Sequence, residues 1–344
     1  MKLRSARIPG FALALLAGTT ILATIVPLGA VLLCRSAFAS DASGAIQTAQ
    51  RQFNSGNYTA AIKTLQSVAQ VSASAEGQYW LGRNYYELRD YDNAIAAAEK
   101  AVELDPKSSL YHEWLGRIYG GKADRDRSFS YARKVKKEFE EAVRLNPSNT
   151  DARRDLEQYS MEAPWVVGGS KDEAKDQVAA IEAIDPVEGH LARAAYDLDA
   201  KKTELAEKEY RDVLAAKPKK IEPYLDVINF FIHQNKPADA EAAIQAAALV
   251  SPNDPRLAYY RGVSRVLSGT DLSRGEEYLK SYLASSPDRS DWPSHAGARE
   301  WLGRLYEAEG KRAEAAEQYR AALQLDPGRK EAKSRLEKLE KSSH

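Results

Sequence analysis

Residues 75–108 read AEGQYWLGRNYYELRDYDNAIAAAEKAVELDPKS, and this stretch decides the fold. Apolar residues recur at helical spacing at Leu81, Tyr85 and Leu88. After a turn at Arg89–Asp90, a second amphipathic helix is marked by Ala94, Ile95, Ala98, Ala101 and Val102. The pair Asp105–Pro106 ends this helix, because the residue before a proline is pushed out of the α-helical region. The stretch therefore predicts two antiparallel helices joined by a tight turn.

A pentapeptide within this stretch is repeated elsewhere in the chain. EWLGR occurs at 113–117 and at 300–304, and the near copy YWLGR lies at 79–83. Gly82 is placed where two helices must approach closely, and Trp80 is available to fill the space beside it. The order of aromatic, Leu-Gly, Tyr, Ala and Pro positions resembles the tetratricopeptide repeat, a helix–turn–helix unit of about 34 residues.

The resemblance covers most of the chain and implies an all-α fold, a right-handed superhelical solenoid. About eight units follow one another, at residues 42–74, 75–108, 109–149, 150–186, 187–220, 221–254, 255–289 and 296–329. The third unit is longer than the others, and we expect its extra residues in the turn; the fourth carries an inserted loop. Residues 330–344 are predicted to be a capping helix and tail, because the last unit of a stack would otherwise expose its apolar face.

The first 39 residues differ from the rest and predict export. Basic residues precede an uncharged stretch that runs from Ile8 to Cys34, and Ala37 and Ala39 then fit the small-x-small pattern of a signal-peptidase site. Residues 1–39 are therefore predicted to be a signal peptide or, if retained, an N-terminal membrane anchor. Either way, the rest of the chain is expected in the periplasm or on the extracytoplasmic face of the membrane. Export and repeats together resemble an exported bacterial tetratricopeptide repeat protein.

The composition argues against several classes of function. Forty-nine basic and 49 acidic residues cancel, so no global field draws the chain to nucleic acid, and membrane contact is expected only through the N-terminal anchor. The one cysteine lies within residues 1–39, which leaves the exported part without a disulfide or a thiolate metal site. The five histidines are scattered and show no HExxH spacing. We predict no catalytic residue, no metal and no cofactor.

The partner-binding residues are implied by the resemblance. In the tetratricopeptide family, the first helix of each unit lines the concave face, and the residue after the signature Gly points into it. Tyr79 and Tyr86 share a helical face with Arg83 through i, i+4, i+7 spacing, and an arginine between tyrosines offers hydrogen-bond donors beside flat apolar area. The resulting candidates for contact with a partner are Tyr79, Arg83, Tyr86, Arg117, Gln158, Asn229 and Arg304.

In an alternative interpretation, two of these arginines do not contact a partner protein. Glu113 precedes Arg117 by four residues, and Glu300 precedes Arg304 by the same spacing, which favours an ion pair worth about 0.2–0.5 kcal/mol on a helix surface. In that case the arginines are ordinary solvated helix residues.

Two insertions offer further candidate contacts. The third unit carries a basic cluster that includes Arg125, Arg127 and Lys134, which either docks an acidic partner or phospholipid headgroups or is a solvated turn and helix face. The fourth unit places Trp165 and Val167 where a polar turn is expected. This loop either touches a partner or membrane or folds back over units three and four.

The sequence thus predicts a noncatalytic scaffold or adaptor outside the cytoplasm that binds a protein or peptide segment in the concave groove. One alternative is a structural or assembly subunit that uses lateral surfaces or the Trp165 loop. Another is an accessory subunit that tethers a cell-envelope enzyme.

Overall fold

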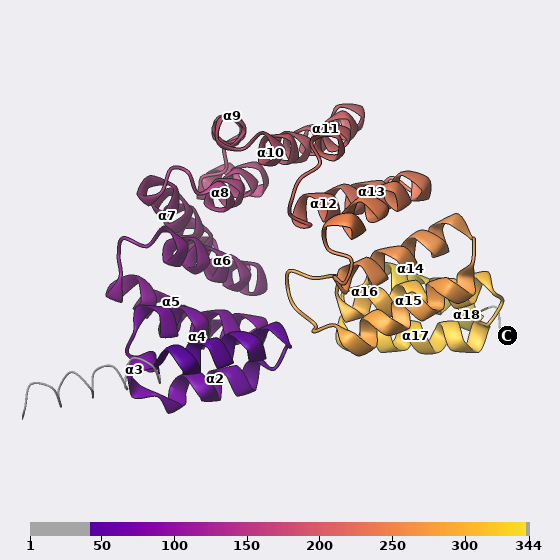
Figure 1. Ribbon diagram of the computed structural model, residues 1–344, viewed down its shortest axis with the longest axis horizontal. Coiled ribbons are helices and arrows are strands. Elements are labelled where there is room, and N and C mark those ends of the chain that lie inside the picture. Colours follow the sequence, from indigo (N-terminus) through magenta and orange to yellow (C-terminus); the bar gives the residue numbers. More distant parts are fainter. Residues whose placement is uncertain (1–41, 342–344) are drawn as a thin grey trace, which may run out of the picture. The chain divides into compact units, whose positions relative to one another are not determined.

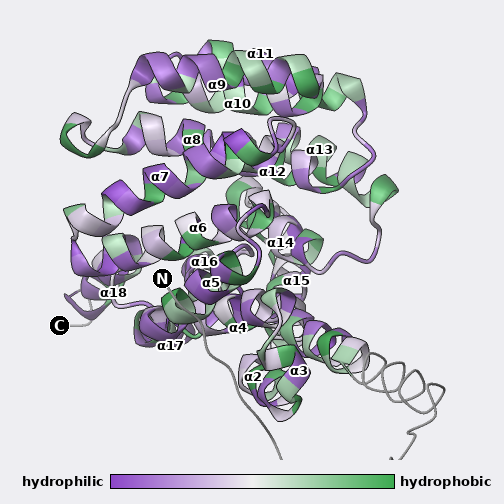
Figure 2. Ribbon diagram, turned by 90° about the vertical axis from the view of Figure 1, so that its left-hand side faces the viewer, coloured by the Kyte–Doolittle hydropathy of each residue, from purple (hydrophilic) through white to green (hydrophobic). Residues whose placement is uncertain are grey.

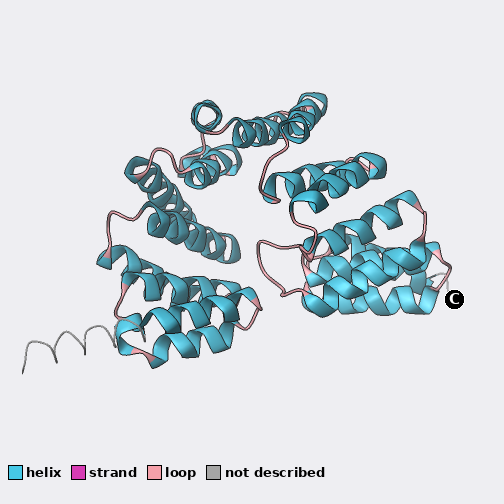
Figure 3. Cartoon of the chain, viewed as in Figure 1, coloured by secondary structure: helices cyan, strands magenta, loops and turns pink. Residues whose placement is uncertain are grey.

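The computed structural model of the protein describes residues 42–341, and the regular elements in this range are helices joined by short loops (Figure 3). The predicted export segment, residues 1–39, lies outside the described residues, as do the last residues of the predicted tail. A helix over residues 42–54 comes first. It is followed by α2 (Tyr58–Ser67), α3 (Ala69–Ser72), α4 (Ala75–Glu87), α5 (Tyr91–Leu104), α6 (Ser109–Asp126), α7 (Phe129–Leu145), α8 (Thr150–Glu162), the 3₁₀ turn η1 (Trp165–Val167) and α9 (Lys171–Ile184).

The second half of the chain also consists of helices joined by loops (Figure 1). Its helices are α10 (Pro186–Asp199), α11 (Thr203–Ala216), α12 (Glu222–His233), α13 (Pro237–Val250), α14 (Arg256–Ser268), α15 (Leu272–Ser285), α16 (His295–Ala308), α17 (Arg312–Leu325) and α18 (Lys330–Lys341). From α4 onward, each even-numbered helix packs on the next helix in the chain, except the last. The prediction of an all-α solenoid of helix–turn–helix units is confirmed.

Several helices begin after a residue whose side chain satisfies one of the first free N–H groups. Ser74, Asp90, Ser108 and Asn149 each accept a hydrogen bond from a backbone N–H in the first turn of α4, α5, α6 and α8, respectively. Hydrophobic and hydrophilic residues share the same helices (Figure 2), so each helix has an apolar face to bury.

The repeated Leu-Gly is explained by packing inside each unit. A Cβ added at Gly116 would lie 2.5 Å from the ring of Phe139 on α7, and one added at Gly303 would lie 2.5 Å from the ring of Tyr319 on α17. At Gly82 the neighbours are the backbones of Ala94 and Ala98 on α5. The glycine therefore makes room for the second helix of the same unit.

This packing predicts opposite effects for two glycines on α6. We expect Gly116→Ala to lower the free energy of unfolding by about 1–3 kcal/mol, because the new methyl group overlaps the Phe139 ring. Gly120→Ala should instead stabilise the protein by roughly 0.5–1 kcal/mol, because its Cβ would lie 4.0 Å from Val135 and alanine is the better helix former. Denaturant unfolding of both variants measures the difference. Equal effects of the two changes would contradict the assigned register.

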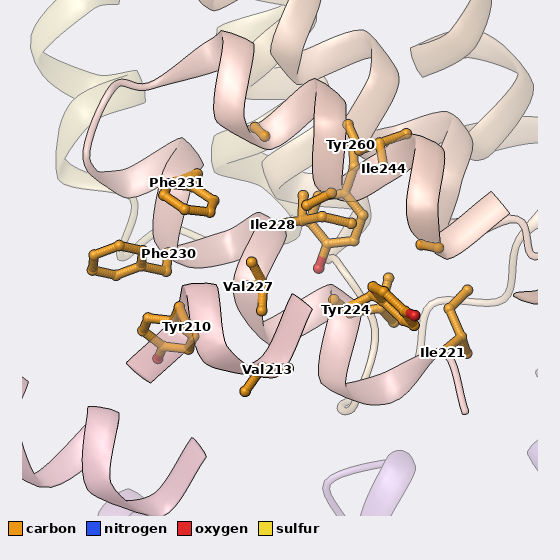
Figure 4. Packing of buried hydrophobic residues seen from close by; sticks show 14 of the residues in the cluster. Tyr210, Val213, Ile221, Tyr224, Val227, Ile228, Phe230, Phe231, Ile244 and Tyr260 are labelled. Atoms are coloured by element: carbon orange, nitrogen blue, oxygen red, sulfur yellow. The ribbon is translucent and has the colours of Figure 1, made fainter. Parts of the chain in front are cut away.

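The largest hydrophobic cluster lies between α10 and α14, where the signature Gly is replaced by Ala194 and Ile228 (Figure 4). The rings of Tyr210 and Phe230 stack with their centroids 4.5 Å apart, and Phe231 is fully buried beside them. Aromatic and β-branched side chains therefore pack this part of the core, where the signature glycine is absent.

The third unit differs from the expectation of a long turn. Its extra residues lengthen α6 and α7, and the connection is only Arg127–Ser128. Lys122 stabilises the added turn of α6 through ion pairs with Asp92 at 2.7 Å and Asp126 at 3.0 Å. At the other end of the solenoid, α18 packs on α17 through the buried Ala332.

Candidate peptide-binding groove

The first helices of neighbouring units, α4, α6, α8, α10, α12 and α14, contact one another in sequence order. A cavity of about 1340 Å³, here called the groove, is bordered by α6, α7 and α8. Its lining includes Tyr86, Trp114, Arg117, Phe129, Gln158 and Tyr159. Aromatic rings and polar groups thus face one another across a space large enough for several side chains.

Arg83 lies in a cage of aromatic rings beside this groove. Its guanidinium carbon is 4.1 Å from the ring centroid of Trp114, 4.6 Å from that of Phe53 and 4.9 Å from that of Trp80. Its Nη1 also donates a hydrogen bond to the Tyr79 hydroxyl at 3.3 Å, and burial raises the pKa of that hydroxyl. Arg83 therefore binds units one, two and three together by cation–π contact, rather than standing free in solvent.

Arg117 is held by two carboxylates. It pairs with Glu113 at 3.0 Å, as the i, i+4 alternative expects, and its Nε donates to Asp155 on α8 at 2.6 Å. Burial raises the pKa of Glu113 to about 7, because the loss of water outweighs the nearby guanidinium and the Asn149 amide. Arg117 consequently links two units while its outer side borders the groove.

Arg304 does not form the i, i+4 ion pair that the alternative expects. Glu300 is buried and pairs with Arg329 at 2.7 Å, so the expected Glu300–Arg304 pair is wrong. The reason is that the carboxylate of Glu300 pairs with Arg329, the last residue of the same unit, which leaves Arg304 without it. Arg304 instead stacks on the Trp301 ring at 3.8 Å, and burial and the neighbouring Arg335 lower its pKa.

The remaining candidates divide between two places. Gln158 is exposed on α8, lines the groove and donates a hydrogen bond to Glu162 at 3.0 Å. Asn229 on α12 lines a separate cavity of about 370 Å³ with Tyr260. The structure therefore brings Tyr86, Arg117 and Gln158 together in one groove and leaves Asn229 and Arg304 elsewhere.

A chain of ion pairs continues along the first helices beyond Arg117. Arg154 on α8 pairs with Glu188 on α10 at 3.0 Å and with Asp226 on α12 at 3.5 Å. Burial raises the pKa of both carboxyl groups. Arg154 and Asp155 are not among the candidates predicted from the sequence. Their spacing was the signal that could have identified them. Arg154 and Asp155 lie one helical turn before Gln158, which is the residue after the signature-Gly position in unit four.

Glu157 occupies the place of the signature Gly in the fourth unit. It is 3% exposed, its Oε1 has no hydrogen-bond partner among the described residues, and burial raises its pKa to about 7. The folded state therefore binds this proton more tightly than the unfolded state does, and stability falls as the pH rises from about 4.5 to about 7.

We accordingly expect Glu157→Gln to raise the free energy of unfolding at pH 8 by on the order of 2–3 kcal/mol and to change it little at pH 4.5. Unfolding curves at the two pH values measure the difference. A gain that is the same at both pH values would contradict a titrating carboxyl group at this position.

The two insertions make mostly internal contacts. Arg125 pairs with Asp126 at 2.8 Å, and Lys134 lies 3.8 Å from Glu99 and 4.8 Å from the ring centroid of Tyr119. Arg127 forms the turn before α7 with a left-handed backbone (φ 52°) and borders the groove. The basic cluster is thus partly neutralised within the chain.

The Trp165 loop folds back, as one of the two alternatives expects, and its contact with a partner or membrane stays a prediction. Val167 is buried, and its carbonyl accepts a hydrogen bond from the Tyr159 hydroxyl at 2.8 Å. Lys136 donates to the Gly168 carbonyl at 2.8 Å. Trp165, by contrast, is 84% exposed. The loop folds back through Val167 and presents Trp165 to solvent.

One segment near the groove had no place in the sequence analysis. Residues 286–294, between α15 and α16, are here called the strap. Ser290 and Asp291 of the strap line the groove, although they are far from α6 in sequence. Burial raises the pKa of Glu87, the residue to which Ser290 is hydrogen-bonded. No periodicity or motif signals a contact across such a sequence separation.

Histidine–carboxylate pairs join the two helices of a unit. His112 Nδ1 lies 2.6 Å from Glu138, and at the equivalent place in unit five His190 Nδ1 lies 2.6 Å from Glu209. His190, Glu209 and Asp212 form the one cluster of metal-ligating types found within the described residues. The equivalent places in units four and eight hold the hydrogen-bonded pairs Arg153–Gln177 and Arg299–Gln318, so this position joins the two helices of a unit.

The site just described belongs to an α-helical repeat protein. The tetratricopeptide repeat model matches residues 75–108, and a second tetratricopeptide repeat model matches residues 266–330. Matches to tetratricopeptide repeat models therefore lie in both halves of the chain.

Individual proteins share shorter or more distant similarity. "Tetratricopeptide repeat protein 1" of Schizosaccharomyces pombe is 33% identical over 70 residues, which make up 19% of this chain and 7% of that protein. A tetratricopeptide repeat protein of Parabacteroides merdae is 14% identical, with a TM-score of 0.46 over 77% of this chain and 98% of that one. The thermophilic protein TTC0263 of Thermus thermophilus is 18% identical, with a TM-score of 0.46 over 56% of this chain and 99% of that one.

No helix within residues 42–341 has both the length and the apolar character needed to cross a membrane.

Proposed function

We propose that this protein is a noncatalytic scaffold that binds an extended segment of a partner protein in the groove. The groove itself carries the proposal: about 1340 Å³ of space combines the rings of Tyr86 and Trp114 with the Arg117–Asp155 pair. Aromatic and arginine side chains dominate the energetics of protein recognition, because they bury large area and donate hydrogen bonds together. Tetratricopeptide repeats, which the chain carries, generally serve as such scaffolds.

The place of binding that we propose is outside the cytoplasm. The support is the basic start, uncharged stretch and small-x-small site within residues 1–39. Fusing residues 1–45 to a reporter enzyme that is active only outside the cytoplasm should give activity. Activity of a cytoplasmic reporter in the same fusion would contradict export.

The binding function is tested by selecting short peptides from a displayed random library on the purified protein. We expect Gln158→Glu to change the affinity for the selected peptides at least about tenfold, down for acidic peptides and up for basic ones, because a charge is added beside Asp155 and Glu162 in the groove. Gln245→Glu is the matched control, because Gln245 is exposed on α13 away from the groove residues. Equal affinity of the two variants would show that selected peptides bind elsewhere.

A second candidate function is that of an assembly subunit, and Trp165 favours it. Trp165 and its neighbour Val166 are 84% and 42% exposed, and adjacent exposed apolar side chains favour a contact surface. Self-association in sedimentation experiments that Trp165→Ser abolishes would support this function. The accessory tether for a cell-envelope enzyme uses the same kind of surface and would appear as a complex with that enzyme.

A further inference from the structure

The strap is a short extended segment that reaches the first two units. The Tyr58 hydroxyl donates a hydrogen bond to the Asp288 carbonyl at 3.2 Å. Arg289 lies with its guanidinium carbon 5.1 Å from the ring centroid of Phe53. Ser290 donates two hydrogen bonds to Glu87, one from its backbone N–H and one from its hydroxyl, each at 2.9 Å. The hydrogen bonds among these contacts join residues separated by 203–230 positions in the sequence.

The backbone of the first unit is shaped to receive the strap. Gly56 has a left-handed backbone (φ 74°), and a Cβ added there would lie 2.8 Å from the Cβ of Pro287. Together with the contacts above, four consecutive strap residues, Pro-Asp-Arg-Ser, occupy a surface made by units one and two. This surface, formed by Phe53, Gly56, Tyr58 and Glu87, is here called the acceptor site.

The strap is weakly held in comparison with the helices around it. Within the strap only Ser286 is buried, and the strap contains no helix. Its other contacts lie within the strap or join it to α14, α15 and α16. They include the Arg289–Asp291 ion pair at 2.6 Å and the Arg256 guanidinium 5.3 Å from the Trp292 ring centroid. The Tyr282 hydroxyl also donates a hydrogen bond to the Pro293 carbonyl, and the His295 backbone N–H donates one to Asp288 at 3.1 Å. Segments with few buried side chains open at low free-energy cost.

We infer that the strap is an internal ligand that a partner segment of the same chemistry, an extended Pro-x-Arg-Ser or Pro-x-Arg-Thr stretch, displaces from the acceptor site. This inference rests on the proposed function and names the partner's chemistry. The proline packs on Gly56, the arginine stacks on Phe53, and the hydroxyl residue gives two hydrogen bonds to the Glu87 carboxylate. A carboxylate that receives paired donors makes strong, directional hydrogen bonds, so it selects for a hydroxyl residue with a free backbone N–H. Because Ser290 and Asp291 also line the groove, displacing the strap would open the groove at that end.

The test uses the full chain with residues 287–293 replaced by a Gly/Ser linker of equal length, and a synthetic peptide with the strap sequence SSPDRSDWPSH as the probe. Circular dichroism first establishes that the variant is folded. We expect the peptide to bind this variant and to bind the wild type at least about tenfold more weakly, because a tethered strap competes at an effective concentration near millimolar. Titration calorimetry measures both affinities.

Matched substitutions locate the interaction. Glu87→Gln in the strap-replaced protein should weaken peptide binding about tenfold or more. Glu103→Gln on α5 should not change it, because Glu103 is exposed and pairs only with Lys100. A peptide carrying Arg289→Ala and Ser290→Ala should lose binding. Equal binding by the Glu87→Gln and Glu103→Gln variants would overturn the acceptor site.

The experiments can overturn the strap inference and the proposed function independently of each other. A folded strap-replaced protein that ignores the strap peptide but still captures library-selected peptides in a Gln158-dependent way overturns the strap inference and leaves the proposed function intact. Loss of both kinds of binding overturns both.

Discussion

Replacing Phe231 by alanine should lower the free energy of unfolding by about 3–5 kcal/mol, the largest loss that we expect from a single truncation. Phe231 has 0% of its surface exposed, and its ring contacts that of Phe230 at a centroid distance of 5.3 Å. Removing it leaves a cavity in the largest hydrophobic cluster of the protein, which joins three units. Denaturant unfolding followed by circular dichroism measures the loss.

The matched control for this truncation is Leu249→Ala on α13. Leu249 is also apolar but 88% exposed, so we expect a change within about 0.5 kcal/mol. Hydrogen exchange should show the loss of protection in Phe231→Ala first in α10 to α14, because each repeat is stabilised chiefly by its nearest neighbours. Comparable losses from the two truncations would contradict the assigned core.

Replacing Arg117 by leucine should destabilise the protein by about 3 kcal/mol, the second-largest effect. The change leaves Glu113 and Asp155 without their cation, and both carboxylates are largely removed from water. The guanidinium carbon of Arg117 also lies 5.1 Å from the Trp114 ring centroid, so the loss includes this cation–π contact.

A double-mutant cycle with Asp155→Asn separates this ion pair from general packing. We expect the double variant to be markedly more stable than the sum of the two single changes predicts, because one unpaired carboxylate is removed together with its partner. Strictly additive effects would mean that Arg117 and Asp155 do not interact in solution.

The sequence predicts the repeated units well because their signals are local. Gly82, Gly116 and Gly303 mark close helix contact through neighbours that belong to the same unit. The cap residues Ser108 and Asn149 act within three residues of themselves. Such short-range chemistry is visible as spacing along the chain.

The candidate site is harder to predict because its contacts cross between units. Arg83 follows the signature Gly as expected, yet Phe53 from the preceding unit and Trp114 from the following one enclose it. Glu300 has the right spacing for Arg304 but pairs with Arg329, which precedes α18. Helix periodicity predicts the helix face on which a residue lies, but it does not predict which residue of another segment contacts that residue.

The extra residues of the third unit show a further limit of turn-based reasoning. The stretch from Gly120 to Asp126 contains two glycines and mixed charges, which suggest a loop. Ion pairs of Lys122 with Asp92 and Asp126 continue α6 instead, so tertiary charge pairing overrides local propensity.

Photo-cross-linking tests whether the groove receives a partner segment. The photoreactive amino acid p-benzoylphenylalanine replaces Gln158 in the groove or, in the matched variant, Gln245 on α13, and each protein is irradiated with a library-selected peptide. Our account predicts a cross-linked product from the Gln158 variant and none from the Gln245 variant. A product from Gln245 alone, or equal yields from both positions, would contradict it.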